Sequence, residues 1–292
     1  MTCRFIQWSL SLVLFVPAWG TELTCATWNM EWFPSGKVNR RLPEVEPERI
    51  QTAAKMLKSI APHILFLQEI RDRETCEALA RALDSHTQVA SCSVFTDDAK
   101  IPTFQQCAIL LRTDERCPSV QTVLSGFKRW KRKGRLVPSR GYAYAVFKIE
   151  EQTVTCYCVH LKANRSGTFR GQQQDIYNRE VAIEQLLTDM KERPADHVII
   201  AGDFNTNLDD AAWVSEASLR RLDENGYAHC FPDVPLSERV TIPAKDGYPD
   251  VTFDYLFFKG FKPKAPGRTE PGAPISDHNA VVVTLCDTGR CP

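Results

Sequence analysis

Short runs of apolar and β-branched residues alternate along the chain with stretches in which the apolar positions recur at a helical period. The helical period predicts helices over 47–60, 74–83 and 175–191, the first of which opens on Pro47. The short apolar runs predict strands over 23–29, 63–69, 107–112, 142–149, 154–160, 197–203, 251–258 and 279–285. This strand-rich pattern predicts an α/β fold in which sheets pack on each other with helices outside.

Composition narrows the class of protein without identifying it. The chain has 292 residues, of which 43% are hydrophobic and 25% charged, which excludes a disordered, collagen-like or coiled-coil protein. Because no repeat or linker interrupts residues 21–292, we expect one domain with one large core. The 36 basic and 36 acidic residues balance, so any affinity for a polyanion must come from a local patch.

The first 20 residues have the features of a secretory signal peptide. Arg4 precedes an apolar run over 5–16, and the small residues Ala18 and Gly20 suit cleavage after Gly20. The run is shorter than the ~20 residues that span a bilayer, so we expect export, to the extracellular space or the periplasm, without a membrane anchor.

Cysteine usage agrees with export. Removal of the leader takes away Cys3 and leaves ten cysteines, an even number that favours disulfides in an oxidising compartment. The short spacings make Cys286 with Cys291 and Cys107 with Cys117 conceivable pairs, but sequence does not assign the connectivity. No Cys-x-x-Cys pair has matching histidines, which disfavours a zinc site.

Polar residues interrupt the predicted strands at or near their ends. Taken singly, each such residue would more often be a cap or a paired core group than a functional residue. Strand ends on one edge of a sheet converge, so together they predict a shared pocket. Carboxylates with an amide oxygen suit Mg²⁺, Mn²⁺ or Ca²⁺, and histidines suit proton transfer. The residues concerned are Asn29, Glu69, His160, Asp203, Asn205, Asp254, Asp277 and His278.

Several motifs, in this order, carry a resemblance to a known family. They are Thr27-Trp28-Asn29-Met30-Glu31, Leu67-Gln68-Glu69-Ile70, Ser139-Arg140-Gly141-Tyr142, Val159-His160-Leu161-Lys162-Ala163-Asn164, Gly202-Asp203-Phe204-Asn205, Phe253-Asp254-Tyr255 and Ser276-Asp277-His278. From about residue 23 to 286 the chain resembles the endonuclease/exonuclease/phosphatase superfamily. The resemblance implies a four-layered α/β sandwich of two mixed β-sheets flanked by helices, and hydrolysis of phosphoesters with a divalent metal.

The resemblance also implies roles for individual residues. The metal, Mg²⁺ with Mn²⁺ or Ca²⁺ as alternatives, would be held by Glu69 with Asn29 and Asp277. Catalysis would fall to His160, Asp203, Asp254 and His278, with Asp254 orienting His278 and Asp203 acting on the attacking water. The phosphate would be bound by Arg140, Asn164 and Asn205. One metal or two, the assignment of acid and base between the histidines, and the role of Glu31 stay open.

Local motifs favour one branch of the superfamily. Residues 68–72 and 276–285 most resemble secreted pancreatic-type deoxyribonucleases, and this suggests an endonuclease acting on DNA, with RNA an alternative substrate. A secreted sphingomyelinase-like or other small-molecule phosphoesterase, a toxin-type nuclease subunit and a non-catalytic binding module are the competing interpretations. The sequence points to no obligate protein partner.

A basic run at 128–140 contains seven lysines and arginines with Trp130 among them. Beside the predicted pocket it would contact the phosphates of a nucleic acid, and Trp130 could stack on a base or enter a groove. A solvated basic loop, or a contact with anionic lipid, is the alternative.

Overall fold

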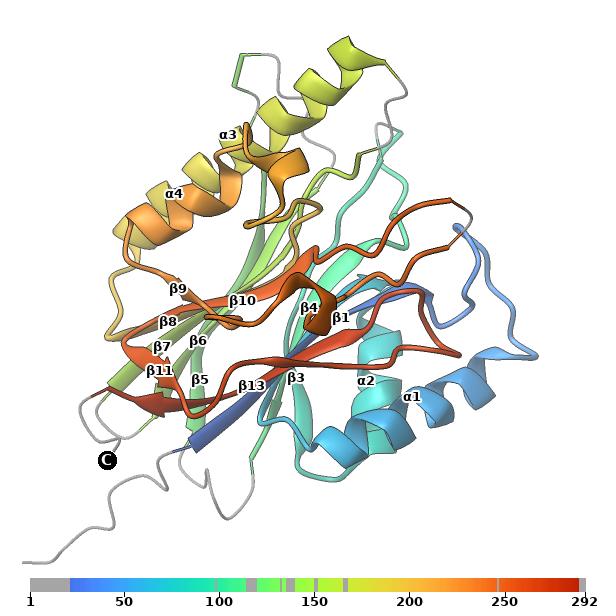
Figure 1. Ribbon diagram of the computed structural model, residues 1–292. Coiled ribbons are helices and arrows are strands. Elements are labelled where there is room, and N and C mark those ends of the chain that lie inside the picture. Colours follow the sequence, from blue (N-terminus) through green and yellow to red (C-terminus); the bar gives the residue numbers. More distant parts are fainter. Residues whose placement is uncertain are drawn as a thin grey trace, which may run out of the picture.

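Two β-sheets packed face to face form the centre of the molecule, which we describe from a computed structural model (Figure 1). The structure describes residues 22–97, 99–113, 120–131, 133–134, 140–149, 152–164, 168–245 and 247–288. The first sheet has the order β11 (Phe261–Pro263), β13 (Ala280–Asp287), β1 (Glu22–Phe33), β2 (Ile64–Ile70), β4 (Gln106–Arg112) and β3 (Thr87–Cys92), with β12 (Arg268–Glu270) paired to β13. The second has the order β5 (Val120–Arg129), β6 (Gly141–Ile149), β7 (Gln152–His160), β8 (His197–Asp203), β10 (Asp254–Lys259) and β9 (Ala228–His229).

Four α-helices in the described residues cover the outer faces. Helices α1 (Glu46–Ile60) and α2 (Arg73–Leu83) lie on the first sheet, and α3 (Phe169–Glu192) and α4 (Ser218–Glu224) on the second (Figure 1). Short 3₁₀ turns occur at Ala211–Trp213 and Leu236–Glu238. The predicted four-layered sandwich of two mixed sheets is therefore confirmed. No helix in the described part of the chain is long and apolar enough to cross a membrane.

Strand β2 begins with four consecutive apolar residues, Ile64 to Leu67, because both of its faces are buried there. Ile64 and Phe66 face the core between the sheets, whereas Leu65 and Leu67 face α1 and α2. A strand buried on both faces needs no polar alternation, and that is why the run reads as continuous. The same central position brings the polar end of this strand, Glu69, into the interior.

Each sheet contains one parallel pair of strands near its middle. In the first sheet β1 runs parallel to β2, and in the second β7 runs parallel to β8, while the other pairings are antiparallel. Parallel strands end at the same edge, so both pairs deliver their carboxyl ends to one side of a sheet. Strand β10 is antiparallel to β8 and begins at that same edge.

Strand and helix boundaries differ from prediction in places with identifiable causes. Strand β5 was not predicted, because as an edge strand it leaves many side chains exposed and lacks an apolar run. Helix α3 begins at Phe169 rather than at 175, because Thr168 caps it by accepting a hydrogen bond from the Gly171 N–H at 3.3 Å. The leader, Cys3, Cys117 and Cys291 lie outside the described residues.

Candidate active site

Strand register aligns three of the predicted residues side by side. His160 at the end of β7 pairs with Asp203 at the end of β8, and Asp203 pairs with Asp254 at the start of β10. In the other sheet Asn29 of β1 pairs with Gln68 of β2, immediately before Glu69. Since the sheets face each other, the Asn29 amide crosses the gap and donates to Asp203 Oδ2 at 3.0 Å.

Backbone irregularities aim the side chains of the first sheet. The pairing of β1 with β2 shifts register between Asn29 and Phe33, where Glu31 and Trp32 have φ values of 45° and 53°. Glu69 also has a positive φ, 57°. Such conformations are costly for non-glycine residues and concentrate at functional sites. Here they direct the Glu69 carboxylate to accept from the Trp32 N–H at 3.2 Å.

Glycine at 202 permits Asp203 to sit beside His160. Gly202 has φ of 148°, and a Cβ there would lie 1.9 Å from the carbonyl oxygen of Val159 on the adjacent strand. The close approach of β7 and β8 thus requires glycine directly before the aspartate. This accounts physically for the first two residues of the Gly-Asp-Phe-Asn motif.

The 276–278 turn is fixed to β1 from both ends. Ser276 Oγ donates to the Asn29 carbonyl at 2.7 Å and accepts from the His278 N–H at 3.0 Å. Trp28 Nε1 donates to the His278 carbonyl at 2.9 Å. The Trp-Asn and Ser-Asp-His motifs are therefore mechanically linked, although they lie about 250 residues apart.

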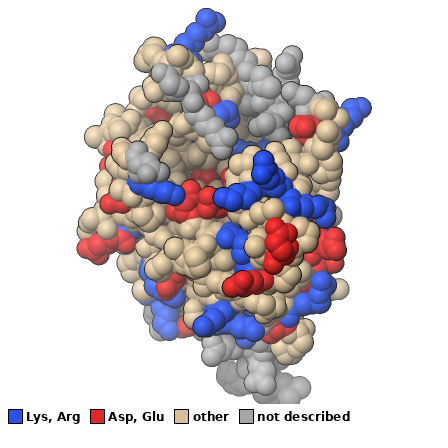
Figure 2. Space-filling model, turned by 90° about the vertical axis from the view of Figure 1, so that its right-hand side faces the viewer, with Lys and Arg blue, Asp and Glu red and all other residues tan. Residues whose placement is uncertain are grey.

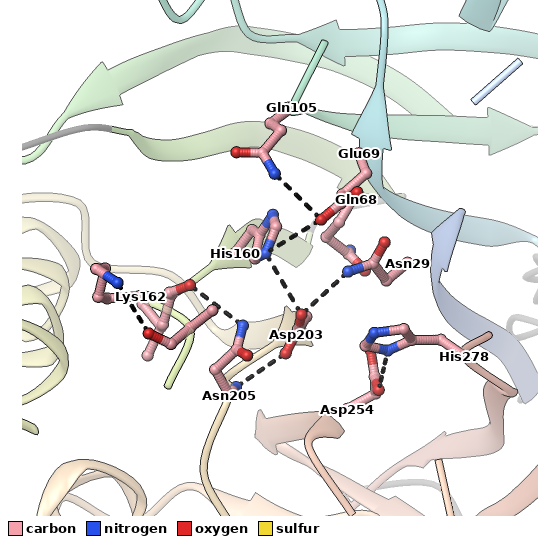
Figure 3. A network of polar contacts seen from close by, with 12 residues as sticks. Asn29, Gln68, Glu69, Gln105, His160, Lys162, Asp203, Asn205, Asp254 and His278 are labelled. Atoms are coloured by element: carbon pink, nitrogen blue, oxygen red, sulfur yellow. Dashed lines mark hydrogen bonds and ion pairs between the residues drawn. The ribbon is translucent and has the colours of Figure 1, made fainter. Parts of the chain in front are cut away.

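The strand ends open into a polar cavity of about 330 Å³. Figure 3 shows the side chains around it pointing toward one another from both sheets. Two predicted site residues do not line it: Asp254 lies behind His278, and Asn164 contacts Asn205. The lining residues are Asn29, Glu31, Trp32, Glu69, Gln105, Arg140, His160, Lys162, Ala163, Asp203, Asn205, Asp277 and His278.

His278 lies in contact with Asp254 and close to Asp203, and burial and charge shift the pKa values of His278 and Asp203. His278 Nδ1 lies 2.8 Å from Asp254 Oδ2, and both residues are buried. Burial alone would lower the pKa of His278, but the carboxylates of Asp254, Asp203 and Asp277 outweigh it and raise the pKa to about 10. Burial and the nearby Asp254 raise the pKa of Asp203 to about 7. The histidine is thus charged at neutral pH, while Asp203 is poised to take up a proton.

On the opposite wall, Glu69 and Arg140 are joined through a residue that sequence reasoning missed. Gln105 donates to Glu69 Oε1 at 3.3 Å and accepts from Arg140 Nη1 at 3.2 Å. Arg140 Nη1 also lies 2.8 Å from His160 Nδ1. Burial raises the pKa of Glu69, although the guanidinium of Arg140 acts in the other direction. The sequence contains little indication of Gln105, which is one of two adjacent glutamines where β4 begins.

Two groups of side chains could hold a metal ion. Ligand atoms of Asp203, Asp254 and His278 all lie within 4.8 Å of one another. Asp254 Oδ1 is buried with no hydrogen-bond partner among the described residues, which leaves an oxygen available to a cation or a proton. The predicted ligands Glu69 and Asp277, together with Asn29, supply oxygen atoms to the same cavity, as Mg²⁺ prefers.

Glu31, whose role the sequence left open, lies at this cavity. It is half-buried, and its Oε2 accepts from the Asp277 N–H at 3.3 Å. Burial and the charge of Asp277 raise its pKa. A carboxylate in this position brings a further oxygen atom, able to hold a cation, to the cavity.

In metal-free buffer, we expect the free energy of unfolding to fall as pH rises. His278 has a folded pKa near 10 against 6.5 for the free side chain, so its contribution is complete below pH 6.5 and disappears toward pH 10. Asp203 has a folded pKa near 7 against 3.8 for the free side chain, so its contribution to the free energy of unfolding also falls as the pH rises between those values. Urea titrations from pH 5 to 10 measure this slope. Asp254→Asn should flatten its upper part, and an equal slope in that variant would contradict the assignment.

The basic run does not present its aromatic residue to a substrate. Trp130 is 6% exposed and packs on Tyr142, with ring centroids 5.0 Å apart, so the prediction that it stacks on a base or enters a groove is wrong. Lys128 pairs with Asp189 of α3, and Lys133 pairs with Glu184. Arg132 and residues 135–139 lie outside the described residues.

Buried acids, histidines and an arginine lie together at one edge of the two-sheet sandwich, an arrangement suited to phosphoester chemistry. The chain matches the Endonuclease/Exonuclease/phosphatase family over residues 26–278, and it belongs to this family. A comparison with curated protein sequences found no match.

Solved structures share the fold at low identity. An endonuclease/exonuclease/phosphatase from Bacteroides vulgatus has a TM-score of 0.67 at 16% identity, covering 91% of this chain and 99% of that one. Truncated TDP2 from Caenorhabditis elegans has a TM-score of 0.61 at 18% identity, with coverage of 91% and 98%. TDP2 from D. rerio, complexed with a single-strand DNA product, has a TM-score of 0.64 at 17% identity, with coverage of 90% and 98%. The resemblance to pancreatic-type deoxyribonucleases stays a prediction.

Proposed function

We propose that the protein is a secreted, divalent-metal-dependent phosphodiesterase that hydrolyses nucleic acid, with DNA as its main substrate. The observation that carries the proposal is the register of His160, Asp203 and Asp254 beside His278, opposite Glu69, in one polar cavity. The single-strand DNA product bound to the D. rerio TDP2 structure supports a nucleic-acid substrate.

The chain's own residues divide the work of in-line hydrolysis. Asp203, with a pKa near 7, accepts a proton from the attacking water. As the bond between phosphorus and the leaving oxygen breaks, His278, kept charged by Asp254, gives its proton to that oxygen. Arg140 offers positive charge to the phosphoryl oxygens from the other wall of the cavity.

Glu69, Asn29 and Asp277 would hold the divalent cation, which offsets charge on the phosphate when bound. We assign it there rather than to the aspartate–histidine group, because a histidine that is charged at neutral pH carries protons on both ring nitrogens and offers no lone pair to a cation.

Trp32 supports a substrate that carries a base. It lines the cavity beside the polar groups and is half-exposed, and its backbone is fixed by the Gly36 N–H bond to its carbonyl at 3.0 Å. A planar ring held beside the phosphate site favours substrates that can stack on it. The face in Figure 2 shows acidic side chains around a hollow with lysines and arginines on both sides, a distribution that suits a metal and a polyanion together.

The proposal is tested on purified, oxidised protein with supercoiled plasmid, with and without excess chelator, alongside a sphingomyelin assay. Metal-dependent nicking supports the nuclease. If the plasmid stays intact while sphingomyelin is cleaved, the protein is a phosphoesterase that acts on lipid, and the proposal of a nucleic-acid substrate is wrong. Amino-terminal sequencing of exported protein tests cleavage after Gly20.

Export predicts a cross-link between α2 and β3. The sulfurs of Cys76 and Cys92 lie 3.9 Å apart, and Cys92 is partly exposed. With oxidised glutathione as electron acceptor, the two thiols should lose two protons and two electrons and form one disulfide. Closing a loop of roughly 15 residues is worth about 3 kcal/mol of unfolding free energy. Peptide mapping without reduction should find the pair, and Cys92→Ser should abolish the gain; a reduced pair after oxidation would contradict the prediction.

A further inference from the structure

Helix α3 carries a fully buried arginine outside the cavity. Arg179 is 0% exposed, and it donates from Nε and Nη2 to the two oxygens of Glu216, at 2.8 and 2.6 Å. Ser218 Oγ also donates to Glu216, at 2.6 Å. The guanidinium lies 5.7 Å from the ring centre of Trp213. The charge of the arginine is thus neutralised by a bidentate partner that is itself held in place.

The third nitrogen of Arg179 reaches the segment that follows β7. We name residues 161–164 the strap; it directly follows His160, and two of its residues line the cavity. Arg179 Nη1 donates to the Lys162 carbonyl and to Asn164 Oδ1, both at 2.8 Å. Asn164 Nδ2 in turn donates to the carbonyl of Asn205 at 2.8 Å. One buried cation therefore connects with two segments that form the cavity.

Asn205 and the strap are also bonded to each other and to the active groups. Asn205 Nδ2 donates to the Leu161 carbonyl at 3.3 Å, and its N–H donates to Asp203 Oδ1 at 2.8 Å. Arg140 Nη2 donates to the same Leu161 carbonyl at 2.8 Å. A displacement of the strap would therefore move the acceptor shared by Arg140 and Asn205, and with it the orientation of Asp203.

Stability alone does not explain this arrangement. A buried ion pair often contributes no more to stability than well-packed apolar side chains of the same volume. What the guanidinium adds is a rigid fork with five donors, which fixes several acceptors at defined angles. Here the fork joins α3, the 211–216 turn and the strap.

We propose that Arg179 is a positioning residue for hydrolysis, acting through Asn164 and the strap on Asn205. This inference rests on the proposed function of the cavity, but its structural part does not need the substrate to be known. Asn164, predicted as a phosphate ligand, has both ends of its carboxamide bonded within the protein and serves here as the link between α3 and Asn205.

The test compares Arg179→Met, Arg179→Lys and Asn164→Ala on whichever phosphodiester the wild-type protein cleaves. We expect Arg179→Met to lower kcat by about 10- to 100-fold, with KM nearly unchanged, because geometry rather than binding is lost. Arg179→Lys keeps the charge beside Glu216 but cannot bond both strap acceptors, so it should restore folding without restoring kcat. Asn164 is exposed, so its alanine variant should fold.

The double variant Arg179→Met/Asn164→Ala separates positioning from general destabilisation. If Arg179 acts through Asn164, the double variant should lose little more than the worse single variant, whereas additive losses would overturn the proposal. Arg221→Ala is the matched control. Arg221 of α4 pairs with Glu184 of α3, the helix that carries Arg179, but does not contact the strap, so the kcat of this variant should be unchanged.

Hydrogen exchange of the strap gives a readout independent of activity. Amides at 161–164 and 203–207 should exchange faster in Arg179→Met and at the wild-type rate in Arg221→Ala. If the wild-type protein cleaves no phosphodiester but exchange is still faster in Arg179→Met than in wild type, the proposed function fails and the positioning contact stands. Unchanged exchange with unchanged kcat would overturn the positioning role itself.

Discussion

Replacing His278 by Ala is expected to lower kcat by about 10³-fold while the protein stays folded. The imidazole lies at the cavity, and Asp254 and Asp203 keep its pKa near 10, so the variant removes both a proton donor and a positive charge facing the phosphate. The loss should appear in kcat and in kcat/KM together, because charge on the phosphoryl oxygens grows toward the transition state. Steady-state kinetics with the cleaved phosphodiester measure it.

Two comparisons make the His278 result interpretable. His86→Ala removes an exposed histidine from the turn between α2 and β3 and should leave kcat unchanged. His278→Gln keeps a polar side chain beside Asp254, so it should fold even if the alanine variant does not. A His278→Gln protein within a few-fold of wild-type kcat would exclude the imidazole from the mechanism.

Glu69→Gln is expected to weaken Mg²⁺ binding by about 10- to 100-fold and to lower activity at limiting metal correspondingly. The change removes one negative charge from the cavity and leaves the side-chain shape intact, so the bond from the Trp32 N–H can persist. Titration calorimetry with Mg²⁺ alone measures the affinity without reference to any substrate.

The control for Glu69→Gln is Glu74→Gln, an exposed carboxylate in the first turn of α2. Asp203→Asn discriminates between the two candidate metal groups. If Mg²⁺ affinity collapses in Asp203→Asn and survives in Glu69→Gln, the ion binds at the aspartate–histidine group, and our assignment to Glu69, Asn29 and Asp277 is wrong.

The elements that could be predicted from sequence are those in which burial follows a regular pattern along the whole helix or strand. Strand β2 is buried on both faces and begins with a run of four apolar residues, and the buried residues of α2 recur at the helical period. Strand β5 lies at an edge, and α4 has only seven residues, so neither has enough buried positions to produce a pattern. Their existence depends on tertiary neighbours that a local window does not contain.

The sequence predicted the site residues that lie at strand ends, because the ends of neighbouring strands converge at one edge of a sheet. His160, Asp203 and Asp254 were expected near one another, and the register places them on three adjacent strands. Gln105 and Trp32 were missed, because their positions follow from register shifts and positive φ angles rather than from a residue pattern. The Trp130 prediction failed for the opposite reason, since basic neighbours suggested exposure whereas Tyr142 buries the ring.

The two parallel strand pairs have a consequence for how the protein can be divided. Asn29 and Glu69 come from one sheet, and His160 and Asp203 from the other, so neither sheet by itself holds a complete set of reactive groups. A fragment that contained only the amino-terminal strands β1 to β4 would also lack the 276–278 turn, which lies near the end of the chain, directly before β13. We therefore expect hydrolysis to require the assembled sandwich, and a truncated or incompletely translated chain to be inactive.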